Sequence, residues 1–481
     1  MIDRTTIPRM PWHDVGCAVS GSIASDFARH FIQRWNATRV RKVKRRRKRG
    51  NGTLPIPPML LPCPPCEPWT RLNLSTVCGK RRAHPVQMQA LRSAGRWALV
   101  ASAGNNGLNS TKDTAAIPNN LDITPEYTER SILNAYIEAI RNSKHYVYIE
   151  NQFFISWLDE TTMGHDMQSS SNSNIAGSET ELLPGVVQNT ITQALFERIV
   201  QAHRERKPYR VYIILPLLPG FAGDPGSRQT GISIHCVLHY IRESLFRGPT
   251  ALIPRLNLIM ERPWDYVSVC GLRKYETWPD GLLTTEFIYV HCKLMIVDDR
   301  KLIIGSANIN DRSMLGYRDS ELALVAEDTE EVGTLKEAVF AKKKVMIGEV
   351  ARRFRKTLMA EHLGVLTKES RDNLDWDYTL LDDPVCDEFY HNVWCKTADM
   401  NMDLFDKVFS CLPSNELHSF ADVKLMRQHD PLFIRDSEQA KQLVKGIRGH
   451  LVRYPEDFLR DEDISPPQGS KEIVVPAIVW T

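Results

Sequence analysis

The sequence predicts an α/β fold, in which a mixed and mostly buried central sheet is flanked by helices. From residue 129 onward, strand patterns and helix patterns alternate, as they do in that class. Between residues 287 and 309, apolar and β-branched runs lie on both sides of a polar break, which predicts two strands joined by a tight turn at Asp299–Arg300. A length of 481 residues with 42% hydrophobic side chains leaves room for two or three domains.

Each expected element rests on a local pattern of apolar and turn-forming residues. Residues 14–21 predict a strand and residues 25–35 a helix, and residues 129–154 predict a helix followed by a buried strand. The later elements are expected as a helix at 185–206, a strand at 210–215, a glycine-rich loop at 219–231, a helix at 232–247, a short strand at 266–270, the two strands named above and a helix at 330–360. The chain ends in an apolar, strand-like stretch at 473–481.

These patterns divide the chain into three regions. Residues 1–40 predict a remnant of an N-terminal α/β lobe, and residues 129–481 predict the main, C-terminal lobe. Between them, residues 41–128 are expected to form a linker that is partly disordered, because it begins with a basic run and continues with too many prolines for a helix or a central strand. Small polar residues predict a flexible insertion at 158–180.

Composition argues against several classes of protein. No run of about eighteen apolar residues is present, so no transmembrane helix is expected, and charged residues follow Met1, so no signal peptide is visible. The ten cysteines show no disulfide-like pattern, which suits a reducing compartment, and the single pair Cys63 and Cys66 is weak evidence for zinc. The net charge of +3 includes nine cations at 39–49, so the rest of the chain carries about −6.

One short string in the main lobe has the pattern of a phosphate-handling site. His291, Lys293 and Asp298 have the spacing H-x-K-x4-D. Because alternate side chains of a strand share a face, His291 and Lys293 project together. An imidazole can then act as a nucleophile or general acid beside an ammonium that neutralises phosphate oxygens. Ser306 and Asn308 also share a face and are expected to bind the phosphate, whereas Asp298, which completes the catalytic motif, suits bracing of the loop.

The motif and its flanking blocks resemble the phospholipase D superfamily, and within it the eukaryotic enzymes that hydrolyse phosphatidylcholine. The blocks are IENQFF at 149–154, IILPLLPGF at 213–221 and RDSELAL after the motif, and the resemblance covers most of 1–40 and 129–481. It implies two motifs facing each other across one active site. One histidine attacks phosphorus to form a phosphohistidine and the other protonates the leaving alcohol, without a metal or another cofactor. No second H-x-K occurs in the sequence, so we expect a C-terminal portion that lacks the first motif.

Two carboxylates are expected to orient the histidines of such a site. By resemblance, Glu321 holds the position of the acid that lies against the motif histidine, where a carboxylate on one ring nitrogen fixes the tautomer. Asp14 holds the matching position for the first motif. The resemblance therefore implies that Glu321 orients His291 as general acid and base. It also implies that Asp14 is the orienting acid of a histidine that the sequence does not contain.

A basic segment near the start of the sequence suggests contact with an acidic membrane surface. By resemblance, Arg29 and Arg34 match arginines that bind phosphoinositide headgroups, although at a spacing of five on a helix they project about 140° apart. The basic run would add roughly 1 kcal/mol per cation near an anionic leaflet. Its expected membrane-binding residues are Arg41, Lys42, Lys44, Arg45, Arg46, Arg47, Lys48 and Arg49. The same composition also fits a nuclear localisation signal, an RNA-contacting patch or a solvated linker.

The leading interpretation is a phospholipase D that cleaves phosphatidylcholine to phosphatidic acid and choline and transfers the phosphatidyl group to alcohols. The resemblance implies a cytoplasmic protein, peripheral on phospholipid membranes, with phosphatidylinositol 4,5-bisphosphate as activator and small GTPases or kinases as regulators. Nucleic acid is not an expected partner. Two alternatives stay open: a catalytically inactive truncation product that binds lipid or protein, and a one-motif nuclease that acts as a dimer.

Overall fold

The described part of the chain is built around one large mixed sheet. The computed structural model describes residues 10–49, 58, 60, 84–99, 128–159, 187–331, 333–366 and 379–466. Within these residues, eleven strands are hydrogen-bonded in the order β1-β7-β6-β5-β4-β8-β9-β10-β2-β3, with β13 paired to β6. The pairs β1–β7, β4–β5 and β5–β6 are parallel and the others antiparallel. This arrangement confirms the expected α/β class with a mixed central sheet.

The strands of this sheet are β1 (Trp12–His13), β2 (Gln87–Ala94), β3 (Glu129–Arg130), β4 (Tyr146–Asn151), β5 (Arg210–Ile214), β6 (Val267–Thr277), β7 (Leu283–Val290), β8 (Lys293–Val297), β9 (Lys301–Gly305), β10 (Glu321–Glu327) and β13 (Leu451–Arg453). A separate hairpin consists of β11 (Lys336–Phe340) and β12 (Lys343–Ile347). The α-helices are α1 (Ser22–Arg49), α3 (Ser131–Asn142), α4 (Ile191–Arg204), α5 (Ile232–Leu245), α6 (Leu252–Asn257), α7 (Asp311–Met314), α8 (Glu349–His362), α10 (Lys396–Phe409), α11 (Phe420–Met426), α12 (Leu432–Arg435) and α13 (Ser437–Val444).

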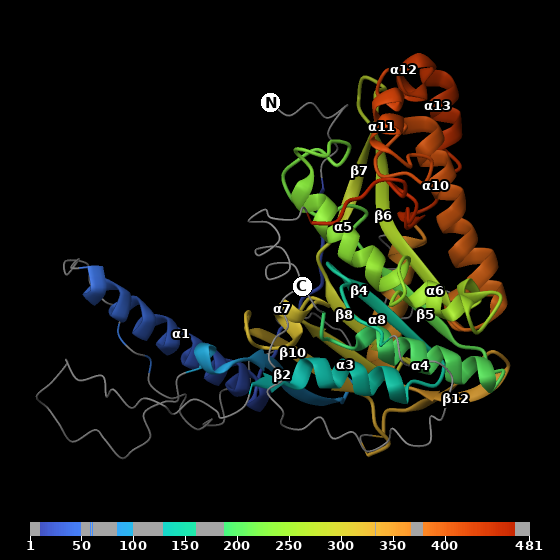
Figure 1. Ribbon diagram of the computed structural model, residues 1–481. Helices are drawn as coiled ribbons and strands as arrows, with labels where there is room; N and C mark the ends of the chain where they lie inside the picture. The colour runs from blue at the N-terminus through green and yellow to red at the C-terminus, as the bar shows by residue number, and fades with distance from the viewer. Residues whose placement is uncertain are drawn as a thin grey trace, which may run out of the picture.

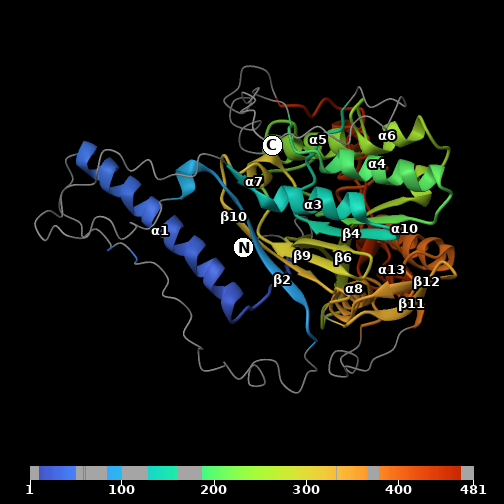
Figure 2. The ribbon, with the colours of Figure 1, turned by 90° about the horizontal axis from the view of Figure 1, so that it is seen from below.

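Helices cover both faces of the sheet, and the strands are buried between them. Figure 2 shows α3 and α4 along one face, with α8 and the β11–β12 hairpin on the other side. In β4, Val147 and Ile149 pack among α3, α4 and α5, whereas Tyr146 and Tyr148 pack toward α8 and the π-helix Glu388–Cys395. The two-residue alternation of a strand therefore divides one apolar run between two cores.

Several expected elements are confirmed. The helix and buried strand expected at 129–154 are α3 and β4, and the helices expected at 185–206 and 232–247 are α4 and α5. The motif strands form an antiparallel hairpin, β8–β9, in which Leu294 pairs with Ile304. The turn of this hairpin covers 298–300, one residue earlier than expected, because Val297 and Lys301 are already paired.

Other expectations were wrong. The expected helix at 330–360 is a hairpin followed by α8, since Ala341 and Lys342 have φ values of +47° and +67° and reverse the chain. Only Trp12–His13 is a strand near the expected strand at 14–21. The expected linker at 41–128 contains the end of α1 and all of β2, which pairs with β10. The insertion at 160–180 and the terminal stretch at 473–481 lie outside the described residues.

The helix α1 projects past the edge of the sheet at β2 (Figures 1 and 2). Its 28 residues include the whole basic run, so these cations lie on a helix. None of the helices that the structure describes is long and apolar enough to span a membrane.

Candidate active site

His291 lies between β7 and β8, and β1 places an acid against its ring. The distance from His291 Nδ1 to Asp14 Oδ2 is 2.7 Å. Because a carboxylate can only accept, this contact requires the proton on Nδ1 and leaves Nε2 as the reactive nitrogen. The ring of Trp12 stacks on the imidazole with centroids 4.0 Å apart. His291 Nε2 makes no hydrogen bond with any residue that the structure describes.

The backbone of β1 explains how Asp14 reaches this position. β1 is parallel to β7, with His13 opposite Val290, and the His291 amide donates to the carbonyl oxygen of His13 at 2.8 Å. Side chains alternate along such a strand. Trp12 and Asp14 both reach the imidazole of His291, whereas the His13 side chain contacts buried Glu150.

Glu321 does not contact His291, and this differs from the expected pairing. Its carboxylate accepts hydrogen bonds from Ser306 Oγ at 2.5 Å and from Ser313 Oγ at 2.9 Å. The physical reason is the sheet order: Glu321 opens β10, which pairs with β9, so its side chain lies over the end of β9. Gly305 permits this approach, because a Cβ there would lie 2.4 Å from the carbonyl oxygen of Leu322. Burial raises the pKa of Glu321, although both serine hydroxyls oppose the shift.

Lys293 is the buried cation of the site. Only 7% of it is exposed, and its ammonium donates to Gln152 Oε1 at 2.9 Å and to the backbone oxygen of His291. Burial lowers the pKa of Lys293 to about 8, and the charges of Asp14 and Glu321 partly oppose the shift. The ammonium is thus charged near neutral pH but poorly solvated, which favours an anion as partner.

The two residues expected to bind phosphate occupy different settings. Ser306 is engaged with Glu321 and also accepts from the amide of Leu322 at 3.1 Å. Asn308 has a buried side-chain oxygen that lacks a hydrogen-bond partner among the described residues. Neither side chain is shown in contact with Lys293, so their expected role in phosphate binding stays a prediction.

Asp298 lies at the far end of the hairpin from His291 and braces the fold. Its carboxylate accepts from the backbone amides of Lys144, His145 and Tyr146 at 2.6, 2.8 and 2.9 Å. The carboxylate of Asp298 therefore binds the backbone at the start of β4. This corrects the grouping of Asp298 with the catalytic residues and fits the expected bracing role. Its φ of +53° places it in the left-handed region that Asp and Asn tolerate.

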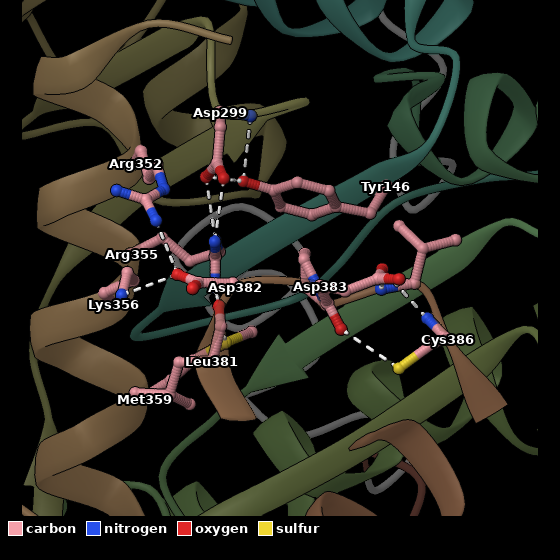
Figure 3. A network of polar contacts seen from close by, with 12 residues as sticks. Tyr146, Asp299, Arg352, Arg355, Lys356, Met359, Leu381, Asp382, Asp383 and Cys386 are labelled. Carbon is pink, nitrogen blue, oxygen red and sulfur yellow. Dashed lines mark hydrogen bonds and ion pairs between the residues drawn. The ribbon is translucent and has the colours of Figure 1, made fainter. Parts of the chain in front are cut away.

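A buried ion pair fixes the same turn from the other side. Asp299 accepts two hydrogen bonds from Arg355, each 2.7 Å, and one from the Tyr146 hydroxyl at 2.6 Å. Figure 3 shows Arg355 reaching Asp299 from α8, with Leu381 and Asp382 beside it. Both charges are fully buried. The turn of the motif hairpin is thus held by β4 and α8 together.

Three side chains donate hydrogen bonds to the buried carboxylate of Glu150 in β4. His13 Nε2 donates to one oxygen at 2.9 Å, and His362 Nε2 donates to the other at 2.7 Å, together with the Tyr148 hydroxyl. Ligand atoms of His13, Glu150 and Cys292 lie within 4.8 Å of one another, as in a metal site. The carboxylate already accepts from three donors, however, and burial raises the pKa of the Cys292 thiol. These residues fit a hydrogen-bond network better than a metal site.

Among the expected phosphoinositide-binding residues, those whose side chains the structure describes have different surroundings. Arg29 pairs with Asp26 at 2.6 Å, while Arg34 and Arg41 lie 4.9 and 5.0 Å from the centroid of the Trp97 ring. A spacing of seven, two helical turns, explains why Arg34 and Arg41 reach the same ring. Lys42 is exposed. The side chains of Lys44, Arg45, Arg46, Arg47, Lys48 and Arg49 lie outside the described side chains.

Sequence reasoning missed three residues of the site. Gln152 holds the Lys293 ammonium, Tyr289 accepts a hydrogen bond from Gln152 at 3.0 Å, and Trp12 stacks on His291. Gln152 is part of the block IENQFF, and Trp12 lies two positions before Asp14. Gln152 directly follows β4 and is half-buried, and a polar residue beside a buried strand was the available signal for function.

Comparisons with known proteins place this geometry in a family. A profile described as Phospholipase D matches residues 2–286 and 284–377. Phospholipase D1 of Mus musculus is 39% identical over 481 residues, covering 100% of this chain and 38% of the relative. Phospholipase D2 of Bos taurus is 40% identical over 482 residues, covering 100% of this chain and 43% of the relative. The chain therefore spans about two fifths of the length of these curated relatives.

A solved structure of a phospholipase D family member, Nuc from Salmonella typhimurium, is 12% identical and covers 52% of this chain and 87% of its own. Its TM-score of 0.20 is too low to carry an argument. The profile match and the whole-chain identity are sufficient by themselves: the chain belongs to the phospholipase D family.

Proposed function

We propose that this chain supplies one half of a phospholipase D active site that hydrolyses phosphatidylcholine to phosphatidic acid and choline. The observation that carries the proposal is the contact between Asp14 Oδ2 and His291 Nδ1, which fixes the proton on Nδ1 and presents Nε2 for proton transfer. Lys293 supports it as a buried ammonium that would neutralise phosphate oxygens. In this role Asp14, rather than Glu321, orients His291.

The proposed reaction has two steps. A histidine from another H-x-K motif attacks phosphorus, the bond from phosphorus to the choline oxygen breaks, and protonated Nε2 of His291 gives its proton to that oxygen. In the second step His291 Nε2 takes a proton from water, or from a primary alcohol, as its oxygen attacks phosphorus and the phosphohistidine bond breaks. The product is phosphatidic acid or a phosphatidylalcohol. The one H-x-K motif of this sequence contains His291, so the proposal takes the attacking histidine from a motif outside this sequence.

Transphosphatidylation tests this proposal directly. The 481-residue chain alone is expected to give no phosphatidylbutanol above the blank from phosphatidylcholine vesicles and butanol. A fused chain, in which the upstream part of a phospholipase D relative with its own H-x-K motif precedes residue 1, is expected to be active. Activity of the fused chain should vanish in His291→Ala and persist in His429→Ala, which alters an exposed histidine on the helical C-terminal part. A folded but inactive fused chain would contradict the proposal.

The alternatives give other outcomes in the same assays. A nuclease that works as a dimer would cut DNA or RNA, ignore phosphatidylcholine and lose cutting in His291→Ala without any fused segment. A binding-only product would stay inactive in the fused chain while still sedimenting with vesicles. The proposal prefers the phospholipase reaction to both alternatives because the relatives that match the whole chain are named phospholipase D.

We further propose that α1 brings the site to a membrane surface from the cytoplasmic side, with phosphatidylinositol 4,5-bisphosphate as activator. Support comes from exposed Arg41 and Lys42 and from two aromatic side chains on the same helix, Phe31 and Trp35, which are 57% and 39% exposed. Aromatic rings and cations together suit the headgroup region of a bilayer. By family resemblance, small GTPases or kinases would regulate such an enzyme.

Vesicle flotation tests the membrane part. We expect binding to rise when phosphatidylinositol 4,5-bisphosphate is added to phosphatidylcholine vesicles, and to fall when three cations of α1, Arg41, Lys42 and Lys44, are changed to glutamine. A matched control changes three exposed lysines on the β11–β12 hairpin, Lys336, Lys343 and Lys344. Equal losses in both variants would indicate a general charge effect and remove α1 from the proposal.

A further inference from the structure

We propose that Glu150 is a positioning residue, which fastens β1 to the catalytic motif and so keeps Asp14 on His291. This inference rests on the proposed function, because it concerns the same histidine. Glu150 is fully buried near the end of β4, and it touches neither His291 nor Lys293 in any recorded contact. Its effect on the site is therefore indirect.

Side chains alternate along β1, so that residues 12 and 14 face His291 and residue 13 faces Glu150. Trp12 and Asp14 contact the His291 ring, and the residue between them, His13, points to the opposite face and donates to Glu150 at 2.9 Å. A displacement of His13 would move both neighbours, because they share one short strand. The contact of His13 with Glu150 thus sets the positions of Trp12 and Asp14.

β1 is too short to be held firmly by its backbone hydrogen bonds alone. This strand has two residues, and its backbone is held by the amide of Tyr289, which donates to Pro11 O at 2.8 Å, and by the amide of His291, which donates to His13 O at 2.8 Å. So few backbone bonds would let an edge strand fray. The His13–Glu150 contact adds a buried, charge-assisted bond, which is of the stronger kind.

The charges around Glu150 keep its carboxylate ionised in spite of its burial. Burial by itself would raise the pKa of Glu150, but the charge of His362 and the hydrogen bonds from His13 and His362 hold it well below its usual value. Burial by itself would lower the pKa of His13, and Glu150 outweighs that effect and raises it. The carboxylate thus stays ionised and binds β1, through His13, to α8, through His362.

The test reads the tautomer of His291 and needs no turnover, so it stays informative if the chain proves inactive. In ¹⁵N-histidine NMR of the 481-residue chain, at a pH where the ring is neutral, His291 is expected as the Nδ1–H tautomer. His291→Gln assigns the signal. Glu150→Gln should shift His291 to mainly the Nε2–H tautomer, and Asp14→Asn should do the same. Asp406→Asn, which alters a half-buried carboxylate on α10 that accepts from Ser414 Oγ, should leave the tautomer of His291 unchanged.

A second variant guards against loss of folding. His13→Gln keeps the backbone of β1 and removes the charge-assisted bond, so it should shift the His291 tautomer in the same direction, even if Glu150→Gln does not fold. An Nδ1–H tautomer retained in folded Glu150→Gln, or in His13→Gln, would overturn the proposal. That result would mean that β1 is held by its backbone alone, and it would leave the proposed function intact.

Discussion

Asp14 and His291 are 277 positions apart in the chain and are joined by a 2.7 Å contact between Oδ2 and Nδ1. The acid comes from the segment that precedes α1, and the histidine comes from the motif of the main lobe. The contact shows that the first residues that the structure describes are part of the same site as the motif. Glu321, which the family pattern had assigned to His291, instead lies over Ser306.

Replacing Asp14 with asparagine should impair catalysis while preserving the fold. An amide can donate to the ring as well as accept from it, so the Nδ1–H tautomer is no longer enforced. In the fused chain, we expect kcat for phosphatidylcholine to fall by on the order of 10²–10⁴. Asp26→Asn, which alters an exposed acid on α1, serves as control. An unchanged kcat in Asp14→Asn would show that the contact is incidental.

Lys293→Met should stabilise the chain at neutral pH, since a poorly solvated ammonium is a cost to folding. Its pKa falls from 10.5 to about 8, so between those values the unfolded state holds a proton that the native state lacks, and native stability rises with pH. We expect Lys293→Met to raise the unfolding free energy by on the order of 1–3 kcal/mol at pH 7. The gain should shrink toward pH 10.5. Urea denaturation at both pH values measures it, and a gain that is independent of pH would refute the buried-charge explanation.

The ion pair of Asp299 and Arg355 should show strong coupling. Arg355→Met leaves a buried carboxylate without its partner and should cost about 3–5 kcal/mol. Asp299→Asn is the suitable second change, because asparagine tolerates the φ of +51° there. The double variant should be more stable than the sum of both losses predicts, by about 1–3 kcal/mol. The exposed pair Lys344 and Glu337 should give no measurable coupling in a parallel cycle.

The stabilising effect of Glu150 should depend on pH in a defined window. Its depressed pKa means that the contribution is present above the ordinary value of 4.5 and is lost on acidification below it. The raised pKa of His13 means that its contribution is present below 6.5 and is lost as pH rises through the native value. Glu361 and Asp14 act on His13 in the same direction. The stability difference between the wild type and Glu150→Gln should therefore be largest between about pH 4.5 and 6.5, as followed by urea denaturation. A difference that is flat across pH 4–8 would contradict it.

Local patterns predicted much of the fold and the centre of the site. The alternation at 287–309 predicted the β8–β9 hairpin, because the period of a strand is written in neighbouring residues. The partner of His291 was not predictable in this way. It depends on a parallel pairing between β1 and β7, and no local pattern specifies a register across so long a separation.

The hairpin at 336–347 escaped prediction for a different reason. Its turn is made by Ala341 and Lys342 at positive φ, and residues of these types normally favour helix. The contacts of half-buried Gln152 and buried Glu150 were not predictable either, because a polar side chain in such a place indicates that it has a partner but not which residue that is.

In the proposed reaction, His291 is the general acid and base, and the nucleophile belongs to another motif. Burst kinetics of the fused chain carrying His291→Ala test it, with a phosphatidyl ester of p-nitrophenol, a leaving group that needs no protonation. We predict a burst of about one p-nitrophenol per site followed by very slow turnover, because the phosphohistidine forms but no base activates water. Absence of a burst, with intact folding and lipid binding, would contradict the account and assign the attack on phosphorus to His291 itself.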